Sequence, residues 1–140
     1  VGGLFVGTTT DSNVLIQKLQ HSPNLSFGNS LYHVDFVCEK GQTPENFDKT
    51  FSGRSPFGIR YKFFLKDAVD DCEECLVHFP TMKKLAAEVG LELMEHVNLH
   101  DFLERACTKS SKQKENIELL TRMRVLDNKN TISPDQWEVA

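Results

Sequence analysis

Two segments of the chain alternate apolar and polar residues with the period of a half-buried β-strand. Residues 31–36 place two aromatic residues and a valine on one face, and residues 57–65 alternate in the same way. Between them lies a polar stretch, residues 39–56, which is interrupted by glycines and prolines. The pattern predicts two strands, paired antiparallel and joined by a long loop, with their aromatic side chains in the core.

Two further segments combine a short apolar run with a helix that follows it. Residues 3–10 are rich in apolar and β-branched residues, and Asp11 and Ser12 are suitable N-cap residues for the next segment. Residues 91–97 form a second apolar run, ahead of a helix that starts at Asn98 or two residues later. Strand, polar loop and helix is the order of an α/β unit, so both runs are predicted to be strands.

The strand predicted over residues 3–10 ends in three hydroxylated residues, Thr8, Thr9 and Thr10. Ligands of open α/β sheets bind beyond the carboxyl ends of the strands. These threonines are therefore candidates for a binding site. Capping of the strand and of the next helix explains them equally well.

The most informative stretch is residues 67–90, DAVDDCEECLVHFPTMKKLAAEVG. Pro80 introduces apolar positions at helical spacing and Gly90 follows the last of them, as expected for a first-turn proline and a C′ glycine. The pattern places a carboxylate pair, Glu73 and Glu74, in a loop that leads into this helix. Loops held by rigid elements often carry binding residues, although the local sequence alone favours two solvated acids.

The C-terminal part of the chain also predicts helices. Residues 109–115 are rich in serine and lysine and are interpreted as a solvated linker, whereas residues 117–126 are amphipathic. Ser133 before Pro134, with Gln136 at the third helical position, is the N-terminal signature of a last helix.

Composition and charge narrow the class of protein only moderately. The 140 residues carry a net charge of −4 and 39% hydrophobic residues, which is typical of a globular domain. The acidic balance does not indicate a nucleic-acid binder, because phosphate contacts come from Lys and Arg. No apolar run reaches membrane-spanning length, and a start at Val1 without a methionine suggests a piece of a longer chain.

The cysteines and histidines form no recognisable metal or catalytic motif. Cys72 and Cys75 make a lone C-x-x-C, without a second pair at zinc-finger spacing. Reduced thiols, as in an intracellular protein, are the expected state of the four cysteines, and the five unclustered histidines are expected to be structural or exposed. The sequence also lacks the P-loop, H-E-x-x-H and G-x-S-x-G patterns. These residues alone therefore indicate part of an α/β domain with a candidate acidic loop.

Six segments of the chain, taken together and in order, carry a family resemblance. They are GGLFVGTTTDSNVLIQKL (2–19), FGNSLYHVDF (27–36), FGIRYKFFLKDAVD (57–70), ECLVHFPTMKKLAAEVGLELMEHVNLHDF (74–102), ELLTRMRVL (118–126) and ISPDQWEVA (132–140). The set resembles the C-terminal half of the eukaryotic mRNA cap guanine-N7 methyltransferases. Their order and spacing match the family almost end to end, which makes the set specific.

The resemblance implies an α/β fold, namely the C-terminal part of a Rossmann-like class I S-adenosylmethionine-dependent methyltransferase domain with an inserted antiparallel strand pair. Residues 1–140 would form the C-terminal portion of that one domain, with the cofactor-binding N-terminal half and the last strand outside the sequence. Consequently no cofactor-binding residue and no metal ligand is expected in this chain, and the chain alone is expected to be inactive. The implied reaction is methyl transfer from S-adenosylmethionine to N7 of the guanine that caps RNA 5′ ends.

The resemblance assigns one residue to the cap guanine. The family has a glutamate at this site just before its L-V-[YH]-F run, and that position is Glu74 when the extra residue of the DDCEE segment is placed ahead of it. The Watson–Crick edge of guanine presents two donors, N1–H and the N2 amino group, and one carboxylate can accept from both. Methylation makes the base cationic, so a nearby anion favours the transition state. N7 has a free lone pair and needs no general base, so catalysis consists mostly of positioning.

Thr10 is a second substrate-binding candidate, because it stands where the family usually has a proline that lines the guanine pocket. A lobe that vertebrate members carry is reduced here to residues 127–131, which leaves open whether an activating subunit docks. The expected partner is the capped 5′ end of RNA, with other capping enzymes or the RNA polymerase II machinery as further candidates. No membrane is expected, and the family implies localisation in the nucleus.

Two other functions remain as alternatives. A degenerate methyltransferase half would serve as a non-catalytic interaction module, and the same fold also serves methyltransferases with another acceptor, because fold alone does not determine function.

Overall fold

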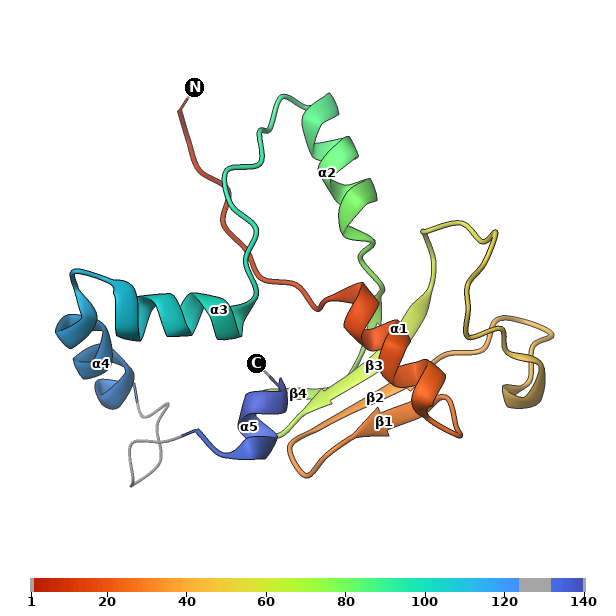
Figure 1. The fold of residues 1–140 in the computed structure, drawn as a ribbon. Helices are drawn as coiled ribbons and strands as arrows, with labels where there is room; N and C mark the ends of the chain where they lie inside the picture. Colours follow the sequence, from red (N-terminus) through yellow and green to blue (C-terminus); the bar gives the residue numbers. More distant parts are fainter. Residues whose placement is uncertain (1, 124–131, 140) are drawn as a thin grey trace. The chain divides into compact units, whose positions relative to one another are not determined.

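The computed structural model describes residues 2–123 and 132–139, which divide into two units, Val1–Glu92 and Leu93–Ala140 (Figure 1). The first unit contains an antiparallel sheet and helices, and the described part of the second contains helices only. The elements follow the chain in the order α1 (Ser12–His21), β1 (Ser26–Gly28), β2 (Tyr32–Phe36), η1 (Pro44–Asn46), β3 (Arg60–Leu65), β4 (Val69–Cys75), α2 (Phe79–Glu88), α3 (Leu99–Glu104), η2 (Arg105–Lys109), α4 (Gln113–Arg122) and α5 (Pro134–Val139).

The sheet of the first unit has four strands in the order β1-β2-β3-β4, and each neighbouring pair is antiparallel. The predicted strand pair is confirmed as β2 and β3, in a register that pairs Tyr32 with Leu65 and Phe36 with Tyr61. The long connection between them is confirmed as a loop that contains only the short helix η1. The two outer strands were not expected, because β1 is too short to show a period and β4, VDDCEEC, is acidic.

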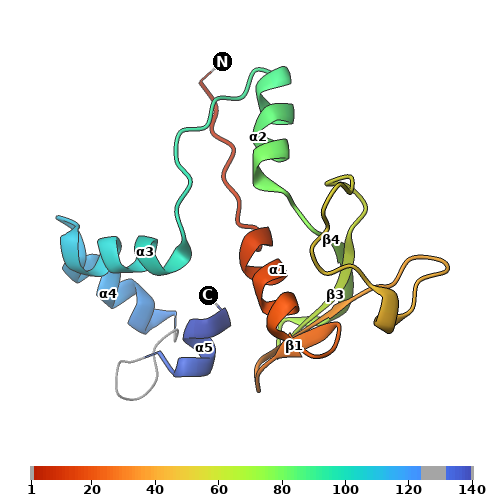
Figure 2. The same ribbon diagram turned by 45° about the vertical axis from the view of Figure 1, so that its right-hand side comes forward.

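The core of this unit lies on the face of the sheet that α1 covers (Figure 2). Tyr32, Val34 and Phe36 alternate with more exposed residues along β2, as predicted, and none of the three is more than 5% exposed. Leu19 of α1 is fully buried, and the predicted N-cap Asp11 accepts a hydrogen bond from the Asn13 amide at 2.8 Å. Capping thereby fixes where α1 begins, and burial fixes which face it turns to the sheet.

Two predicted strands are not formed in this structure. Residues 3–10 and 91–97 form no strand, and the three apolar residues at 4–6 are 82–87% exposed. A strand needs a neighbouring strand for its N–H and C=O groups, and neither run belongs to the sheet of the described chain. Their apolar, β-branched composition favours a strand, but these residues cannot form one without a neighbouring strand to pair with.

The acidic stretch is a strand, not the predicted loop. Pairing with β3 overrides the low strand propensity of its carboxylates, so Glu73 and Glu74 both lie within β4. The β3–β4 ladder also contains a bulge. The Leu65–Val69 pair is followed by Phe63–Cys72, so β4 carries one residue more than β3 across this interval.

Helix α2 follows the prediction closely. Pro80 lies in its first turn, and Gly90 adopts a φ of +79° just after the helix. The Gly90 amide donates to the Ala87 carbonyl and the Leu91 amide to the Ala86 carbonyl, both at 3.0 Å. This pair of bonds is the Schellman motif, in which the C′ residue must be left-handed and glycine is favoured.

In the second unit the predicted starts of two helices are confirmed. The Asn98 side chain accepts from the His100 amide at 2.7 Å and starts α3. At α5 the Gln136 amide donates to Ser133 Oγ at 3.2 Å, while the Ser133 amide donates to Gln136 Oε1 at 2.9 Å, which completes a capping box.

The linker predicted over residues 109–115 is wrong at its end, because α4 begins at Gln113. Its first residues are good helix formers, so a charged and polar composition does not prevent a helix there. The predicted amphipathic segment 117–126 falls partly within α4. Residues 124–131, which include the reduced lobe, lie outside the described residues.

Candidate functional site

The two neighbouring glutamates of β4 face opposite sides of the sheet, because side chains alternate along a strand. Glu73 forms an ion pair with Arg60 at 2.8 Å, and both of these side chains are nearly half exposed. Glu74 is the cross-strand partner of Tyr61 and lies on the other face. The interpretation as a solvated acid therefore fits Glu73 but not Glu74.

Glu74 and Thr10, the two substrate-binding candidates from the sequence, are linked through Tyr61. The Tyr61 hydroxyl donates a hydrogen bond to Glu74 Oε2 at 2.7 Å, and Thr10 Oγ1 lies 3.1 Å from the same hydroxyl. A phenol has one proton, and Tyr61 gives it to Glu74, so the Thr10 hydroxyl must be the donor in the second bond. The structure thus brings residues 10, 61 and 74 into one hydrogen-bonded chain.

Tyr61 is held rigidly at the centre of these two hydrogen bonds. Its residue surface is 1% exposed, and its ring lies 5.9 Å from the ring of Phe36, centroid to centroid. The pKa of Tyr61 is raised to about 12: burial is the largest cause, the hydrogen bond and charge of Glu74 also raise it, and the hydrogen bond with Thr10 partly offsets these effects. The phenol is therefore neutral at physiological pH and serves as a fixed hydrogen-bond donor.

Thr10 owes its position to the start of α1. It precedes the N-cap Asp11, and Ser12 after it is 4% exposed, so the chain is anchored where it passes Tyr61. Thr10 itself is half-buried, whereas Thr8 and Thr9 are exposed. Of the three candidate threonines, Thr10 is the one that the structure joins to Glu74.

Tyr61 is the site residue that sequence reasoning missed as such. The alternation of residues 57–65 placed its aromatic side chains in the core, which is correct for Tyr61. Its contact with Glu74 depends on the pairing of β3 with β4, and the acidic β4 gave no strand signal. Finding this contact from the sequence would have required the prediction that the two segments pair.

The half-buried Glu74 carboxylate retains capacity for a ligand. An ionised carboxylate has about four acceptor positions, and Tyr61 occupies one of them. Both oxygens can therefore still accept hydrogen bonds from a group with two adjacent N–H donors.

The cysteines and other metal-ligating side chains add no second site to this face. The four cysteines are free thiols, and Cys72 and Cys75 project to opposite faces of β4 because they are three residues apart. The described residues contain no group of three or more His, Cys, Asp or Glu side chains that could hold a metal ion. Nor does any described helix have the length and apolar character needed to cross a membrane.

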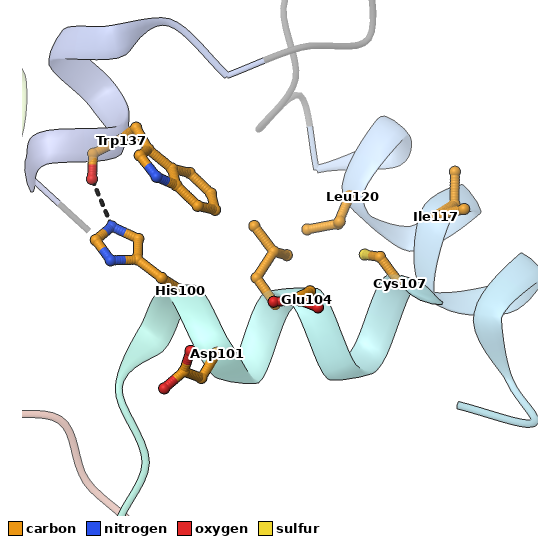
Figure 3. Close-up of a pocket in the computed structure, with 8 residues that line it drawn as sticks. His100, Asp101, Glu104, Cys107, Ile117, Leu120 and Trp137 are labelled. Atoms are coloured by element: carbon orange, nitrogen blue, oxygen red, sulfur yellow. Dashed lines mark hydrogen bonds between the residues drawn. The ribbon is translucent and has the colours of Figure 1, made fainter. Parts of the chain in front are cut away.

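A separate cavity of about 400 Å³ lies within the second unit, among α3, η2, α4 and α5 (Figure 3). His100 stacks on Trp137 with ring centroids 4.4 Å apart, and its Nε2 lies 2.6 Å from the Trp137 carbonyl oxygen. Neither Thr10 nor Glu74 lines this cavity, and sequence reasoning did not select its residues. The lining residues are His100, Asp101, Leu103, Glu104, Cys107, Ile117, Leu120 and Trp137.

Comparison with known proteins identifies the family of the chain. A family model described as the mRNA (guanine-N(7))-methyltransferase domain matches residues 1–140. The chain is 41% identical over 143 residues to mRNA cap guanine-N(7) methyltransferase 1 of Arabidopsis thaliana, covering 99% of this chain and 36% of that protein. It is 39% identical over 106 residues to the mRNA cap guanine-N(7) methyltransferase of Saccharomyces cerevisiae, covering 73% of this chain and 23% of that protein.

A relative from Cryptococcus neoformans, also named mRNA cap guanine-N(7) methyltransferase, is 30% identical over 145 residues, covering 99% of this chain and 21% of that protein. The chain thus spans little more than a third of the length even of the Arabidopsis relative, at 36%. The match extends over the β3–β4 hairpin and the helices on either side of it. On this evidence the chain belongs to the mRNA (guanine-N7)-methyltransferase family.

Proposed function

We propose that this chain supplies part of the cap-guanine pocket of an mRNA cap guanine-N7 methyltransferase. The enzyme would transfer a methyl group from S-adenosylmethionine to N7 of the guanine in a 5′ GpppN cap. The observation that carries the proposal is the Glu74 carboxylate, which accepts a hydrogen bond from Tyr61 at 2.7 Å and keeps further acceptor positions, while Thr10 binds the same Tyr61 hydroxyl.

Glu74 would read the guanine by its Watson–Crick edge. N1–H and the N2 amino group lie side by side on that edge and match the two oxygens of one carboxylate. A base held in this way presents N7 on its opposite side, where the methyl donor can approach. The negative charge of Glu74 also stabilises the positive charge that develops on the base as the methyl group transfers.

S-adenosylmethionine supplies the methyl group when bound, and we assign no residue of this chain to it. We propose that residues 1–140 form the C-terminal portion of a single Rossmann-like methyltransferase domain whose N-terminal half binds the cofactor. The apolar runs at residues 3–10 and 91–97, which form no strand in this structure, support this arrangement, because strands from another part of the protein would provide a ladder for them. The four-stranded antiparallel sheet would then be the inserted part of the domain.

The partner of the site would be the capped 5′ end of an RNA, in the nucleus, where nascent transcripts are capped. With a net charge of −4 this chain contributes little attraction for phosphates, so the basic contacts to the RNA would come from the rest of the protein. Other capping enzymes and the RNA polymerase II machinery are further candidate partners.

The test is methyl transfer from labelled S-adenosylmethionine to GpppG-capped RNA, using the full-length protein. Glu74→Gln keeps the shape of the side chain but removes its charge and one acceptor oxygen. Because hydrogen bonds to a charged group contribute about 1.5–3 kcal/mol each, we expect kcat/KM to fall about 100-fold or more. Cofactor affinity, measured by calorimetry, should change by less than about twofold.

Glu73→Gln is the matched control, since Glu73 neighbours Glu74 in sequence but faces the other side of β4. It should retain nearly full activity. Equal losses in the two variants, or lost cofactor binding in Glu74→Gln, would indicate a structural role for these residues. A folded wild-type protein without transfer to the cap would favour an interaction module, and label on another acceptor would indicate a different methyltransferase.

A further inference from the structure

The Glu74 carboxylate sits at the end of a flexible side chain, and its hydrogen bond from Tyr61 restricts its orientation. Tyr61 is directly opposite Glu74 in the β3–β4 ladder and binds Oε2 at 2.7 Å. The backbone of Tyr61 is fixed by strands on both sides of β3, and its ring packs against Phe36. A donor held so firmly restricts the position of the group that accepts from it.

Thr10 completes the arrangement from a different part of the chain. Its hydroxyl lies 3.1 Å from the Tyr61 hydroxyl and comes from the segment just ahead of α1. An ionised Glu74 can only accept, so the Tyr61 proton points to Glu74 when Thr10 donates from the other side. Thr10 thus selects the direction of the Tyr61 proton.

We infer that Tyr61 is a positioning residue, which holds Glu74 for recognition of the guanine edge, and that Thr10 orients the hydroxyl of Tyr61 for this purpose. The inference rests on the proposed function and extends it to the residues that set base specificity. Tyr61 is 1% exposed and hydrogen-bonds Glu74 from the neighbouring strand, so it acts on the base through the carboxylate.

The inference predicts a difference in activity between RNA capped with guanosine and RNA capped with inosine. Hypoxanthine, the base of inosine, keeps N1–H and N7 but lacks the N2 amino group, so it offers Glu74 one donor fewer. A carboxylate fixed in one orientation leaves an acceptor unpaired against this base, and sites built for a hydrogen bond reject analogues that lack it. A carboxylate free to rotate would lose much of this discrimination.

The experiment compares kcat/KM for guanosine-capped and inosine-capped RNA in full-length wild type, Tyr61→Phe and Thr10→Val. We expect wild type to prefer guanosine by about 10-fold or more. Tyr61→Phe keeps the ring and removes the hydroxyl, and should reduce the ratio to about two- to threefold. Thr10→Val, which is nearly isosteric, should give an intermediate ratio.

Tyr32→Phe is the control, because Tyr32 is a second buried tyrosine of the same sheet, and its hydroxyl contacts Lys18 instead of Glu74. It should leave the ratio unchanged even if it lowers stability, since partial unfolding reduces activity on both caps equally. An active Tyr61→Phe enzyme with the wild-type ratio would overturn this inference alone. A wild type inactive on both caps would overturn the proposed function together with it.

Discussion

The hydroxyl of Tyr61 is the polar end of a side chain whose ring belongs to the core of the sheet. Phe36 packs against the ring, and Thr10 and Glu74 bind the hydroxyl. Burial is the main reason that the pKa of Tyr61 rises to about 12, because the charged phenolate would lose its hydration. The same burial that fixes the donor in place also keeps it protonated.

This pKa predicts how stability depends on alkaline pH. Below pH 10 the phenol is protonated in both the folded and the unfolded protein, so its contribution is constant. Between pH 10 and 12 the unfolded phenol ionises while folded Tyr61 does not, so the folded state loses stability as pH rises. We expect the free energy of unfolding of wild type to fall by about 1 kcal/mol more than that of Tyr61→Phe between pH 8 and pH 11.

Urea titrations of the full-length wild type and of Tyr61→Phe at both pH values measure this difference. The absorbance of tyrosinate at 295 nm gives an independent check, because subtracting the variant isolates Tyr61. A Tyr61 signal that appears near pH 10 in the folded protein would contradict the raised pKa.

Among the elements, those fixed by local chemistry could be predicted from the sequence. The cap at Ser133 and Gln136 and the C′ role of Gly90 involve residues a few positions apart, and both were predicted correctly. Strand β2 was also predictable, because the alternation of apolar and polar residues along it indicates which face is buried. Strand β4 was not, since its acidic residues form a strand only through pairing with β3.

The candidate site was predictable in part for the same reason. Family resemblance selected Glu74 and Thr10 separately, as two positions 64 residues apart in the sequence. Their link through Tyr61 depends on the register of β3 and β4 and on where α1 starts relative to the sheet. Neither quantity is encoded in a local pattern, so the contact required the structure.

Gly28 and Gly90 allow a matched test of what an added Cβ costs in stability at the end of a strand and at the end of a helix. A Cβ at Gly28 would lie 2.2 Å from the Tyr32 carbonyl oxygen and 2.9 Å from the His33 Cα, whereas a Cβ at Gly90 meets nothing within 4 Å. Gly28→Ala therefore forces backbone atoms of β1 and β2 apart, and should cost about 2–3 kcal/mol of stability. Gly90→Ala adds only the strain of a left-handed alanine, about 1 kcal/mol.

Urea unfolding of the full-length protein, followed by circular dichroism, gives both values. The order of the two costs is the critical result. A Gly28→Ala protein as stable as Gly90→Ala would mean that the β1–β2 hairpin relaxes without loss.

In the complete protein, the two exposed apolar runs are expected to be covered by other segments. Leu4, Phe5 and Val6 are each more than 80% exposed, and Met94 in the second run is 79% exposed. Exposed apolar runs of this kind mark surfaces that other parts of a protein cover. In the proposed domain both runs are strands of the Rossmann-like sheet, paired with strands outside this chain.

Hydrogen exchange of the full-length protein tests this arrangement. We expect the amides of residues 4–8 and 91–97 to exchange slowly, at rates similar to those of the paired strands β2 and β3, because ladder hydrogen bonds would protect them. The loop of residues 39–58 provides the fast-exchanging reference in the same protein. Rates for the two runs as fast as those of this loop would exclude them from a sheet.

The bulge of the β3–β4 hairpin has a consequence for how this hairpin can change length during evolution. Counted residue for residue from the Leu65–Val69 pair, an unbulged ladder would bring Glu73, and not Glu74, opposite Tyr61. A single insertion or deletion between residues 65 and 73 therefore exchanges the carboxylate that faces the core for the one that faces solvent, unless a bulge absorbs it. Changes of two residues keep the same carboxylate on the core face, so whether a length change is odd or even should matter more for this face than which residue is gained or lost.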